Sequence, residues 1–130
     1  MRAGLWPEPD ADTHEAEMRE WFARNDAAVI VAARADGCAL AGFAEVGTRS
    51  VVDESETTPV AYLEGWYVDH DVRRQGVGAA LVRSAEKWAR AKGYREFGSD
   101  VELENIISQH AHLALGFSET SRAVNYIKTL

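Results

Sequence analysis

The hydrophobic pattern of the chain changes its period within residues 62–92, where a run typical of a strand gives way to one typical of a helix. Residues 60–68 are rich in β-branched and aromatic side chains, so we expect a central β-strand there. Gly65 interrupts this run at a point where a bulge, or the close approach of a ligand, is expected. From Val77 the apolar residues recur at helical spacing, which predicts an amphipathic helix that stops at Gly93.

Weaker patterns on both sides of this stretch predict the other elements of one mixed α/β (α+β) domain over residues 1–130. Asp12 or Thr13 could cap a helix that runs to about Arg24. An Asp-Gly turn at residues 36–37 separates two apolar runs and predicts a β-hairpin. The predicted elements are a rigid extended opening at 6–9, strands at 28–34, 38–46, 60–68 and 94–99, an acidic loop at 48–59, helices at 77–92 and 105–115, and a final strand after Phe117.

The turn between the central strand and its helix carries candidate chemistry. It reads Arg73-Arg74-Gln75-Gly76-Val77-Gly78, and no Ser, Thr, Asp or Asn stands directly before the helix to cap its first N–H groups. The glycines allow the backbone to approach an anion, and the helix dipole and two arginines favour negative charge, so a phosphate-bearing ligand fits. A tight turn that merely contains glycines is the alternative, because short glycine motifs are frequent by chance. The sequence has neither the G-K-[ST] of a P-loop nor a dinucleotide G-x-G-x-x-G.

Composition narrows the class of partner. The 130 residues, 46% of them hydrophobic, are enough for one globular domain with one core. The net charge of −7 disfavours nonspecific binding to nucleic acid or to an anionic membrane, and it favours a cationic partner. No apolar run approaches the roughly 20 residues of a membrane span, and no signal peptide is visible, so we expect a cytoplasmic protein.

Cysteine and histidine residues give no sign of a metal site. Cys38 is the only cysteine, which is typical of a reducing compartment, and its apolar neighbours predict a structural role in a buried strand. His110 and His112 are two residues apart and therefore do not share a helix face. Because no set of His, Cys and carboxylate residues has metal-ligand spacing, we predict that the protein binds no metal.

A strand with a bulge-like Gly65, followed by R-x-x-G-x-G at the start of an amphipathic helix, resembles the acetyl-coenzyme A (acetyl-CoA) site of the GNAT superfamily of N-acetyltransferases. A narrower set of segments is similar to the type I branch of the aminoglycoside 6′-N-acetyltransferases. These segments are Leu5-Trp6-Pro7, Leu63-Glu64-Gly65, Ser99-Asp100, Glu104-Asn105, Ile107-Ser108-Gln109 and Ala114-Leu115-Gly116-Phe117.

The resemblance implies a fold and a reaction. The GNAT fold has a mixed central sheet with a splayed strand at the acetyl-CoA site and helices on its flanks. The reaction is direct transfer of acetyl from acetyl-CoA to the 6′-amine of an aminoglycoside, which confers antibiotic resistance. The neutral amine attacks the thioester, so one group must accept its proton and another could protonate the departing thiolate.

The resemblance also implies roles for single residues. Asp100 and Glu64 match carboxylates that contact the aminoglycoside, with Asp100 the usual candidate base. Carboxylates hold an amine in its charged form, so we expect binding first and proton abstraction second. His112 stands where many of these enzymes have a tyrosine that protonates the thiolate. Trp6 matches an aminoglycoside contact, and Glu119 is a nearby acidic candidate. The residues implied to bind acetyl-CoA are Trp66, Tyr67, Val68, Arg73, Arg74, Gln75, Gly76, Val77, Gly78, Ala79 and Asn105.

Each of these assignments has a purely structural alternative. Asp100 could be a turn residue, and Glu64 a solvated strand end. Trp6 and His112 could serve only in packing, and Asn105 could be a simple helix cap.

Departures from the resembled enzymes leave other functions open. Val51 and Ser121 replace an aromatic contact and a glutamate, which affects the range of drugs. The chain starts five residues ahead of Trp6, so we expect the sheet to lack the usual first strand. A second copy could cover the exposed edge by β-addition or exchange, giving a homodimer. The alternative functions are a GNAT enzyme that acts on another polyamine or a protein amine, and a noncatalytic module that binds acetyl-CoA.

Overall fold

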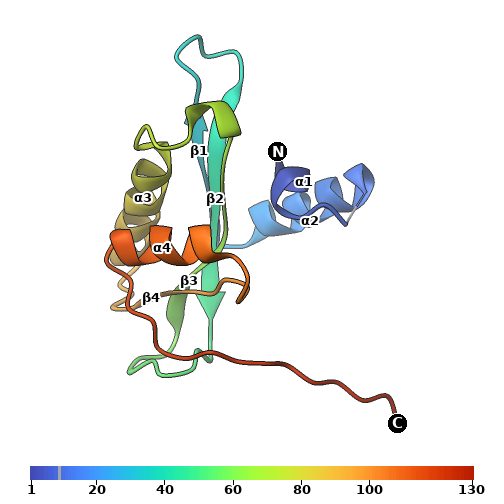
Figure 1. The fold of residues 1–130 in the computed structure, drawn as a ribbon, viewed down its shortest axis with the longest axis vertical. Coiled ribbons are helices and arrows are strands. Elements are labelled where there is room, and N and C mark those ends of the chain that lie inside the picture. Colours follow the sequence, from blue (N-terminus) through green and yellow to red (C-terminus); the bar gives the residue numbers. More distant parts are fainter. Residues whose placement is uncertain (9) are drawn as a thin grey trace.

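The structure, a computed structural model, describes residues 1–8 and 10–130. In chain order its elements are α1 (Arg2–Leu5), α2 (Ala11–Ala23), β1 (Ala28–Ala33), β2 (Leu40–Arg49), β3 (Val60–Val68), the 3₁₀ turn η1 (His70–Val72), α3 (Val77–Ala91), β4 (Phe97–Ser99) and α4 (Ile106–Ala114). Figure 1 shows α3 on one side of the sheet and α1 and α2 on the other. The mixed α/β class predicted from the sequence is confirmed.

The four strands form one mixed sheet in the order β1-β2-β3-β4. β1 and β3 each run antiparallel to β2, whereas β4 runs parallel to β3. Parallel neighbours require a crossover connection, and α3 supplies it between β3 and β4. Because β3 spans Val60–Val68, the predicted central strand is confirmed with both of its ends.

The apolar face of α3 packs on the sheet and forms the core. Gly76 precedes the helix with a φ of +86°, and no side chain among the described residues caps it, as the sequence predicts. Gly93 follows the last turn with a φ of +90°, a left-handed conformation that favours glycine, so the predicted end is also confirmed. The buried core cluster consists of Ala44, Val46, Leu63, Leu81, Val82 and Ala85.

A buried ion pair attaches the N-terminal helices to the opposite face of the sheet. Arg2 Nε donates to Glu45 Oε1 at 2.6 Å, and Glu45 is only 1% exposed. Arg2 also donates through Nη1 to Glu17 Oε2 of α2 at 2.6 Å. A buried charge requires a partner of opposite sign, so Arg2 both compensates Glu45 and links α1 to α2.

The start of α2 differs from the prediction. Its cap is Asp10, whose side chain accepts from the Thr13 backbone N–H at 2.8 Å, rather than Asp12 or Thr13. The reason is that Asp10 has extended backbone angles, which bring its carboxylate to the third N–H of the helix. In the predicted extended opening, Trp6 is extended, with φ −123° and ψ 93°, whereas Pro9 lies outside the described residues.

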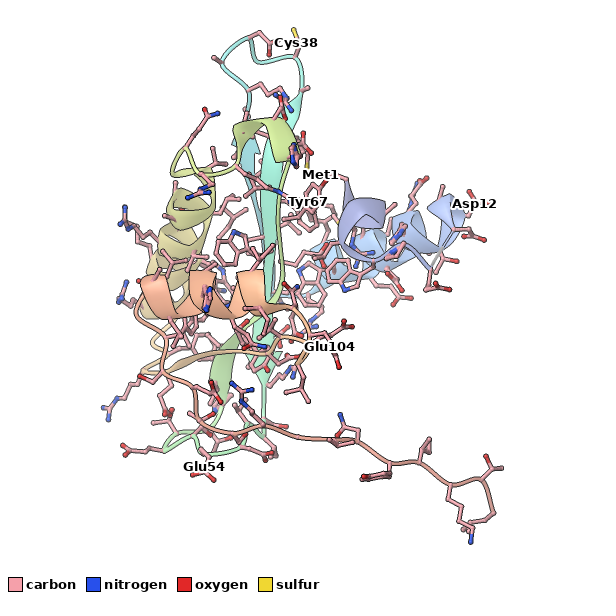
Figure 2. All side chains as sticks on the ribbon, in the orientation of Figure 1. Met1, Asp12, Cys38, Glu54, Tyr67 and Glu104 are labelled. Carbon is pink, nitrogen blue, oxygen red and sulfur yellow. The ribbon has the colours of Figure 1, made fainter. Side chains whose placement is uncertain are left out.

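The tip of the β1–β2 hairpin is longer than predicted. The Arg34 backbone N–H donates to the Ala39 carbonyl at 2.8 Å, which closes a loop over residues 34–39. Cys38 lies in this loop and is exposed, so its prediction as a structural residue of a buried strand was wrong. Figure 2 shows its sulfur at the far tip of the hairpin.

The C-terminal part of the chain forms less of the sheet than predicted. β4 has only three residues, and α4 begins and ends within one residue of its prediction. Residues 117–130 contain no regular secondary structure, so the predicted final strand was wrong. An isolated strand is not stable without neighbours, and this segment extends away from the body in Figure 1. No helix in the described ranges is both long and apolar enough to cross a bilayer.

Candidate active site

β4 pairs with only the first part of β3. Their parallel ladder ends at the pair of Leu63 and Ser99. Beyond this pair, no strand in the part of the chain that the structure describes is paired with this side of β3. The backbone of residues 64–68 therefore has an open edge, which is the splay expected in the sheet.

The ladder between β2 and β3 contains a bulge at the same level. Gly65 pairs with Glu45 and Leu63 pairs with Val46, so Glu64 is an extra residue on β3. A bulge re-aims the side chain of the extra residue and is common next to active sites. The irregularity predicted at Gly65 is confirmed, and the extra residue is the predicted site residue Glu64.

A cavity of about 650 Å³ lies where β4 leaves β3. Three predicted site residues line it, namely Asp100, His112 and Glu119. Two others, Glu64 and Trp6, are not among the described residues of its lining. Its charged side chains are Arg49, Asp53, Asp100, Glu102, Glu104, Glu119 and Arg122, of which five are acidic and two basic. This excess of negative charge favours a cationic ligand.

Four side chains form one connected polar group at the cavity. The Tyr62 hydroxyl donates to Asp100 Oδ1 at 2.6 Å. Arg49 donates through Nε to Glu64 Oε1 at 3.0 Å and through Nη2 to Glu64 Oε2 at 2.5 Å. The same Nη2 atom lies 3.6 Å from Asp100 Oδ1. The guanidinium carbon also lies 3.5 Å from the centre of the Tyr62 ring. Arg49 thus bridges the two predicted site carboxylates.

Burial and hydrogen bonding give these four side chains different roles. Burial first, and then the hydrogen bond to Asp100, raise the pKa of the Tyr62 hydroxyl well above its usual range, so it stays a donor. The hydrogen bonds to Glu64 raise the pKa of Arg49, so it stays cationic. The Glu64 side chain is only 22% exposed, against 73% for Asp100. Asp100 is therefore the carboxylate that a ligand can reach.

His112 is held on several sides at the back of the cavity. Its Nδ1 lies 2.8 Å from the Ser108 carbonyl oxygen, which can only accept, so Nδ1 carries the proton. Its Nε2 lies 3.0 Å from Ser99 Oγ, and that hydroxyl donates to the Leu63 carbonyl at 3.2 Å. The ring packs at 5.5 Å from Trp66 and 5.1 Å from Phe117. These contacts agree with a packing role for His112. Its role as the acid that protonates the departing thiolate stays a prediction.

Trp6 packs directly on the backbone of β3. A Cβ at Gly65 would lie 2.3 Å from the Trp6 ring, so only glycine permits this contact. The Trp6 carbonyl oxygen lies 3.0 Å from His14 Nε2. The Arg2 guanidinium carbon lies 4.7 Å from the centre of the Trp6 ring. The close approach predicted at Gly65 therefore comes from Trp6, and an aminoglycoside contact of Trp6 stays a prediction.

The predicted anion-binding turn is exposed and pre-shaped. Arg73, Arg74, Gln75 and Gly76 are all exposed, and Val77, Gly78 and Ala79 form the first turn of α3. Arg73 Nε donates to the Val68 carbonyl at 2.8 Å, which ties the turn to the end of β3. Arg74 has a φ of +61°, an uncommon conformation for a residue other than glycine. The uncapped start of α3 thus directly follows an exposed turn that carries two arginines, an arrangement that favours an anion.

Trp66 and Tyr67 lie on opposite faces of β3. A Cβ at Gly78 would lie 2.7 Å from the Trp66 ring, and a Cβ at Gly4 would lie 2.9 Å from the Tyr67 ring. Trp66 Nε1 is buried and has no hydrogen-bond partner among the described residues. A buried donor without a partner is costly, so a ligand acceptor at this position would remove the cost. The open edge of β3, this N–H group and the uncapped start of α3 fit an extended ligand that ends in phosphates, as acetyl-CoA does.

Two further predicted residues are engaged in local pairs. Asn105 Oδ1 accepts from the Ser108 backbone N–H at 3.1 Å and caps α4, so the simple cap interpretation is satisfied. Glu119 pairs with Arg122 at 2.6 Å. Both residues are exposed, and their ligand roles stay predictions.

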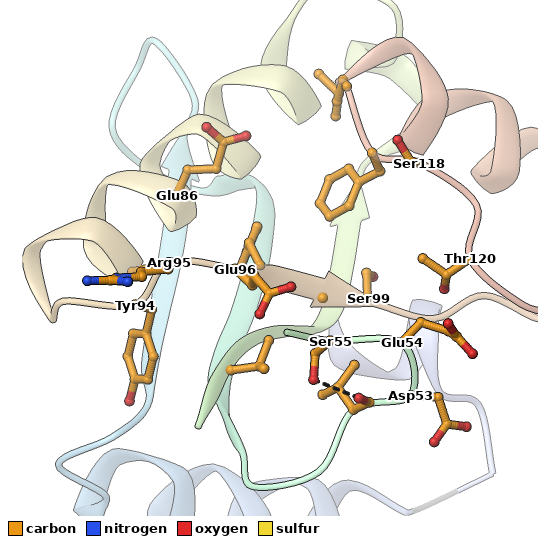
Figure 3. A pocket seen from close by; sticks show the side chains of 18 of the residues that line it. Asp53, Glu54, Ser55, Glu86, Tyr94, Arg95, Glu96, Ser99, Ser118 and Thr120 are labelled. Carbon is orange, nitrogen blue, oxygen red and sulfur yellow. Dashed lines mark hydrogen bonds between the residues drawn. The ribbon is translucent and has the colours of Figure 1, made fainter. Parts of the chain in front are cut away.

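A second cavity of about 340 Å³ lies on the outer side of β4 (Figure 3). Figure 3 shows that the loop with Asp53, Glu54 and Ser55 closes one side, while Ser118 and Thr120 close another. Ser55 Oγ donates to the Val52 carbonyl at 2.7 Å and shapes the loop. This cavity borders the unpaired edge of β4.

Two residues of the polar group, Arg49 and Tyr62, were not predicted from the sequence. The period of two along a strand places Tyr62 and Glu64 on the same face of β3, and this signal could have found Tyr62. Arg49 depends on the β2–β3 register, for which the sequence carries no signal. Within the described ranges, no three His, Cys, Asp or Glu residues are grouped as a metal site would require.

Comparisons with known proteins agree with this geometry. The profile of the acetyltransferase (GNAT) family matches residues 1–117. The aminoglycoside N(6′)-acetyltransferase type 1 of Klebsiella aerogenes is 46% identical, over 100% of this chain and 87% of that protein. AAC(6′)-Iy in complex with the bisubstrate analogue CoA-S-monomethyl-acetylneamine has a TM-score of 0.92 and 38% identity, over 100% of this chain and 88% of the other. Apo AAC(6′)-IG from Acinetobacter haemolyticus has a TM-score of 0.91 and 36% identity, over 99% and 88% of the two chains.

Proposed function

The chain belongs to the acetyltransferase (GNAT) family, and we propose that it transfers acetyl from acetyl-CoA to the 6′-amine of an aminoglycoside antibiotic. The observation that carries this proposal is the open edge of β3, which leads from the acidic cavity to the uncapped start of α3. The names of relatives that are 36–46% identical support the choice of substrate. Acetylation removes the positive charge of the amine, which is the basis of a resistance activity.

Acetyl-CoA supplies an acetyl group as a thioester, which an amine can attack directly. We assign its pantetheine arm to the backbone edge of residues 64–68 and to the Trp66 indole N–H, which has no protein partner among the described residues. Its phosphates are assigned to the turn of residues 73–79, because the helix dipole, free N–H groups and arginines all favour anions there. Asn105 at the start of α4 is a further contact candidate.

The chain supplies the amine site through its carboxylates. Asp100 is exposed to the cavity, and its Oδ1 is occupied by Tyr62, so its other oxygen is the one available to an ammonium group. Asp100 first binds and orients the amine and then accepts its proton, directly or through water. Glu119 lies in the cavity lining, whereas Glu64 and Trp6 lie outside it, Glu64 in its pair with Arg49 and Trp6 against Gly65 of β3. We assign all three as further contacts of the aminoglycoside.

The test is the release of free thiol from acetyl-CoA in the presence of kanamycin or tobramycin. Analogues with a 6′-hydroxyl in place of the 6′-amine are the matched controls. Turnover only with the 6′-amine is the expected result. Turnover with another polyamine or a protein amine, and not with the aminoglycosides, would identify that amine as the substrate instead. Binding of acetyl-CoA without any turnover would overturn the enzyme assignment in favour of a noncatalytic module.

We further propose that the protein is a homodimer. β1 and β4 are the edge strands of the described sheet. The C-terminal arm (residues 118–130) lines the cavities with its first part, and its end extends into solvent. The exposed apolar side chains of this arm are Val124, Tyr126, Ile127 and Leu130. Exchange of the arm between two copies would cover both an open strand edge and this apolar surface. Sedimentation velocity over a wide range of concentrations tests this, and a monomer throughout would contradict it.

We also propose a cytoplasmic location, where acetyl-CoA is available to the enzyme. Cell fractionation followed by the thiol-release assay tests this location, and activity found outside the cytoplasmic fraction would overturn it.

A further inference from the structure

We propose that Arg49 is a positioning residue that tunes the charge of the amine site, so that the site binds a cationic substrate and still allows its proton to leave. This inference rests on the proposed function, because it concerns how an amine becomes a nucleophile in the cavity. Arg49 is the last residue of β2, and it is not among the site residues predicted from the sequence.

The geometry places Arg49 between the two carboxylates. Its Nε and Nη2 atoms donate to the two oxygens of Glu64 at 3.0 and 2.5 Å, a two-point contact that fixes the orientation of both groups. Nη2 lies 3.6 Å from Asp100 Oδ1, and Tyr62 holds that same oxygen at 2.6 Å. The guanidinium carbon lies 3.5 Å from the centre of the Tyr62 ring, and this contact further restricts the motion of the Arg49 side chain.

The charges of this group explain why a cation is needed there. Glu64 and Asp100 without Arg49 would present a charge of −2, whereas the two carboxylates and one guanidinium together present −1. The other charged or titratable groups around the cavity are Asp53, Glu102, Glu104, His112, Glu119 and Arg122. Arg122 is paired with Glu119, and Arg24, whose charge also acts on Glu64, is paired with Asp26. Arg49 is therefore the cation that contacts both site carboxylates among the described residues.

The physical consequence is a compromise between binding and reactivity. Carboxylates near an amine favour its ammonium form and raise its pKa, but only the neutral amine attacks a thioester. By neutralising Glu64, Arg49 lowers this effect while leaving Asp100 to bind the amine. The choice of arginine also matters, because its planar fork matches both oxygens of a carboxylate.

The experiment measures the pH dependence of kcat and KM for tobramycin in Arg49→Gln. Loss of the cation should move the acidic limb of the kcat profile to higher pH by about one unit. At pH 7 this corresponds to a fall in kcat of about tenfold, whereas KM should stay the same or decrease. A residue with only a structural role would raise KM and leave the limb where it is.

Three variants keep the result interpretable. Arg49→Lys keeps the charge and should restore most of the pH profile. The double variant Arg49→Gln/Glu64→Gln restores a total charge of −1 at positions 49, 64 and 100. It should therefore return the acidic limb of the kcat profile towards its wild-type position. Arg34→Gln is the matched control, because Arg34 pairs with Asp69 and Asp71 at 2.7 and 2.8 Å outside the cavity lining. It should leave the profile unchanged.

The outcomes separate this inference from the proposed function. An active wild-type protein whose Arg49→Gln profile does not shift would overturn the role of Arg49 alone. An inactive wild-type protein would overturn the proposed function, and calorimetry of tobramycin binding would then test Arg49. Tighter binding by Arg49→Gln than by wild type would support charge tuning, and equal or weaker binding would refute it. Thermal unfolding of each variant confirms that it is folded.

Discussion

The two halves of β3 have the same neighbour on one side and different surroundings on the other. Residues 61–63 pair with both β2 and β4, and none of residues 60–63 is more than 4% exposed. Residues 64–68 pair only with β2 among the described strands, and most of them are half-buried. One strand thus serves as core in its first half and as a ligand-binding edge in its second half.

The change between the halves occurs over two residues. The β4 ladder ends at Leu63, and the bulge against β2 lies at Glu64. A paired edge satisfies its own N–H and C=O groups, whereas an open edge keeps them available for a ligand. The length of β4 therefore determines where the core stops and the site begins.

The strongest test of this comparison is Asp100→Asn, just beyond the end of β4. We expect kcat/KM to fall by about 10²–10⁴ because a positioned proton acceptor is lost. The unfolding temperature should stay close to that of wild type, because the side chain is largely exposed. Steady-state kinetics and thermal unfolding measure the two effects. A fall in stability comparable to the fall in activity would contradict the separation of site and core.

Leu63→Ala tests the first half of the strand. Leu63 is 3% exposed and belongs to the core cluster, so we expect a loss of about 2–5 kcal/mol in the free energy of unfolding. Urea denaturation measures this loss. In conditions where the variant is folded, kcat/KM should change far less than in Asp100→Asn. A loss of activity without a loss of stability would break the comparison.

Trp66→Phe gives the smallest expected effect and tests the second half. Phenylalanine removes the buried N–H that has no partner among the described residues, together with the indole atoms that lie nearest Gly78. Without ligand, the free energy of unfolding should change by no more than about 1 kcal/mol, because the lost packing area offsets the removed donor. The KM for acetyl-CoA should rise several-fold. An unchanged KM would show that this N–H does not meet the ligand.

The sequence predicts the strand β3 and the helix α3 well, because the signals for these elements are local. The ends of β3, the uncapped start of α3 and its stop at Gly93 all follow from short runs of residue types. Asp100 and His112 were assigned to the site only through the resemblance to a known family, and the structure places both in one cavity. Each of these features depends on backbone preferences or on residues close together in the chain.

Features that depend on distant pairing could not be predicted in this way. Arg49 meets Glu64 only because of the antiparallel register between β2 and β3. Residues 123–130 have the composition of a strand, but a strand forms only where a neighbour exists, and the arm extends away from the sheet. The apolar run around Cys38 resembled a buried strand, although hairpin closure at residues 34–39 places it in a loop.

The exposed tip of the hairpin has a practical consequence for enzymology. Cys38 is the only thiol of the chain and is accessible, so a reagent that detects free coenzyme thiol will also titrate the protein itself. The background should be one equivalent per chain, independent of the concentration of drug. Cys38→Ser removes this offset, and the original thiol offers a single position for a fluorescent label.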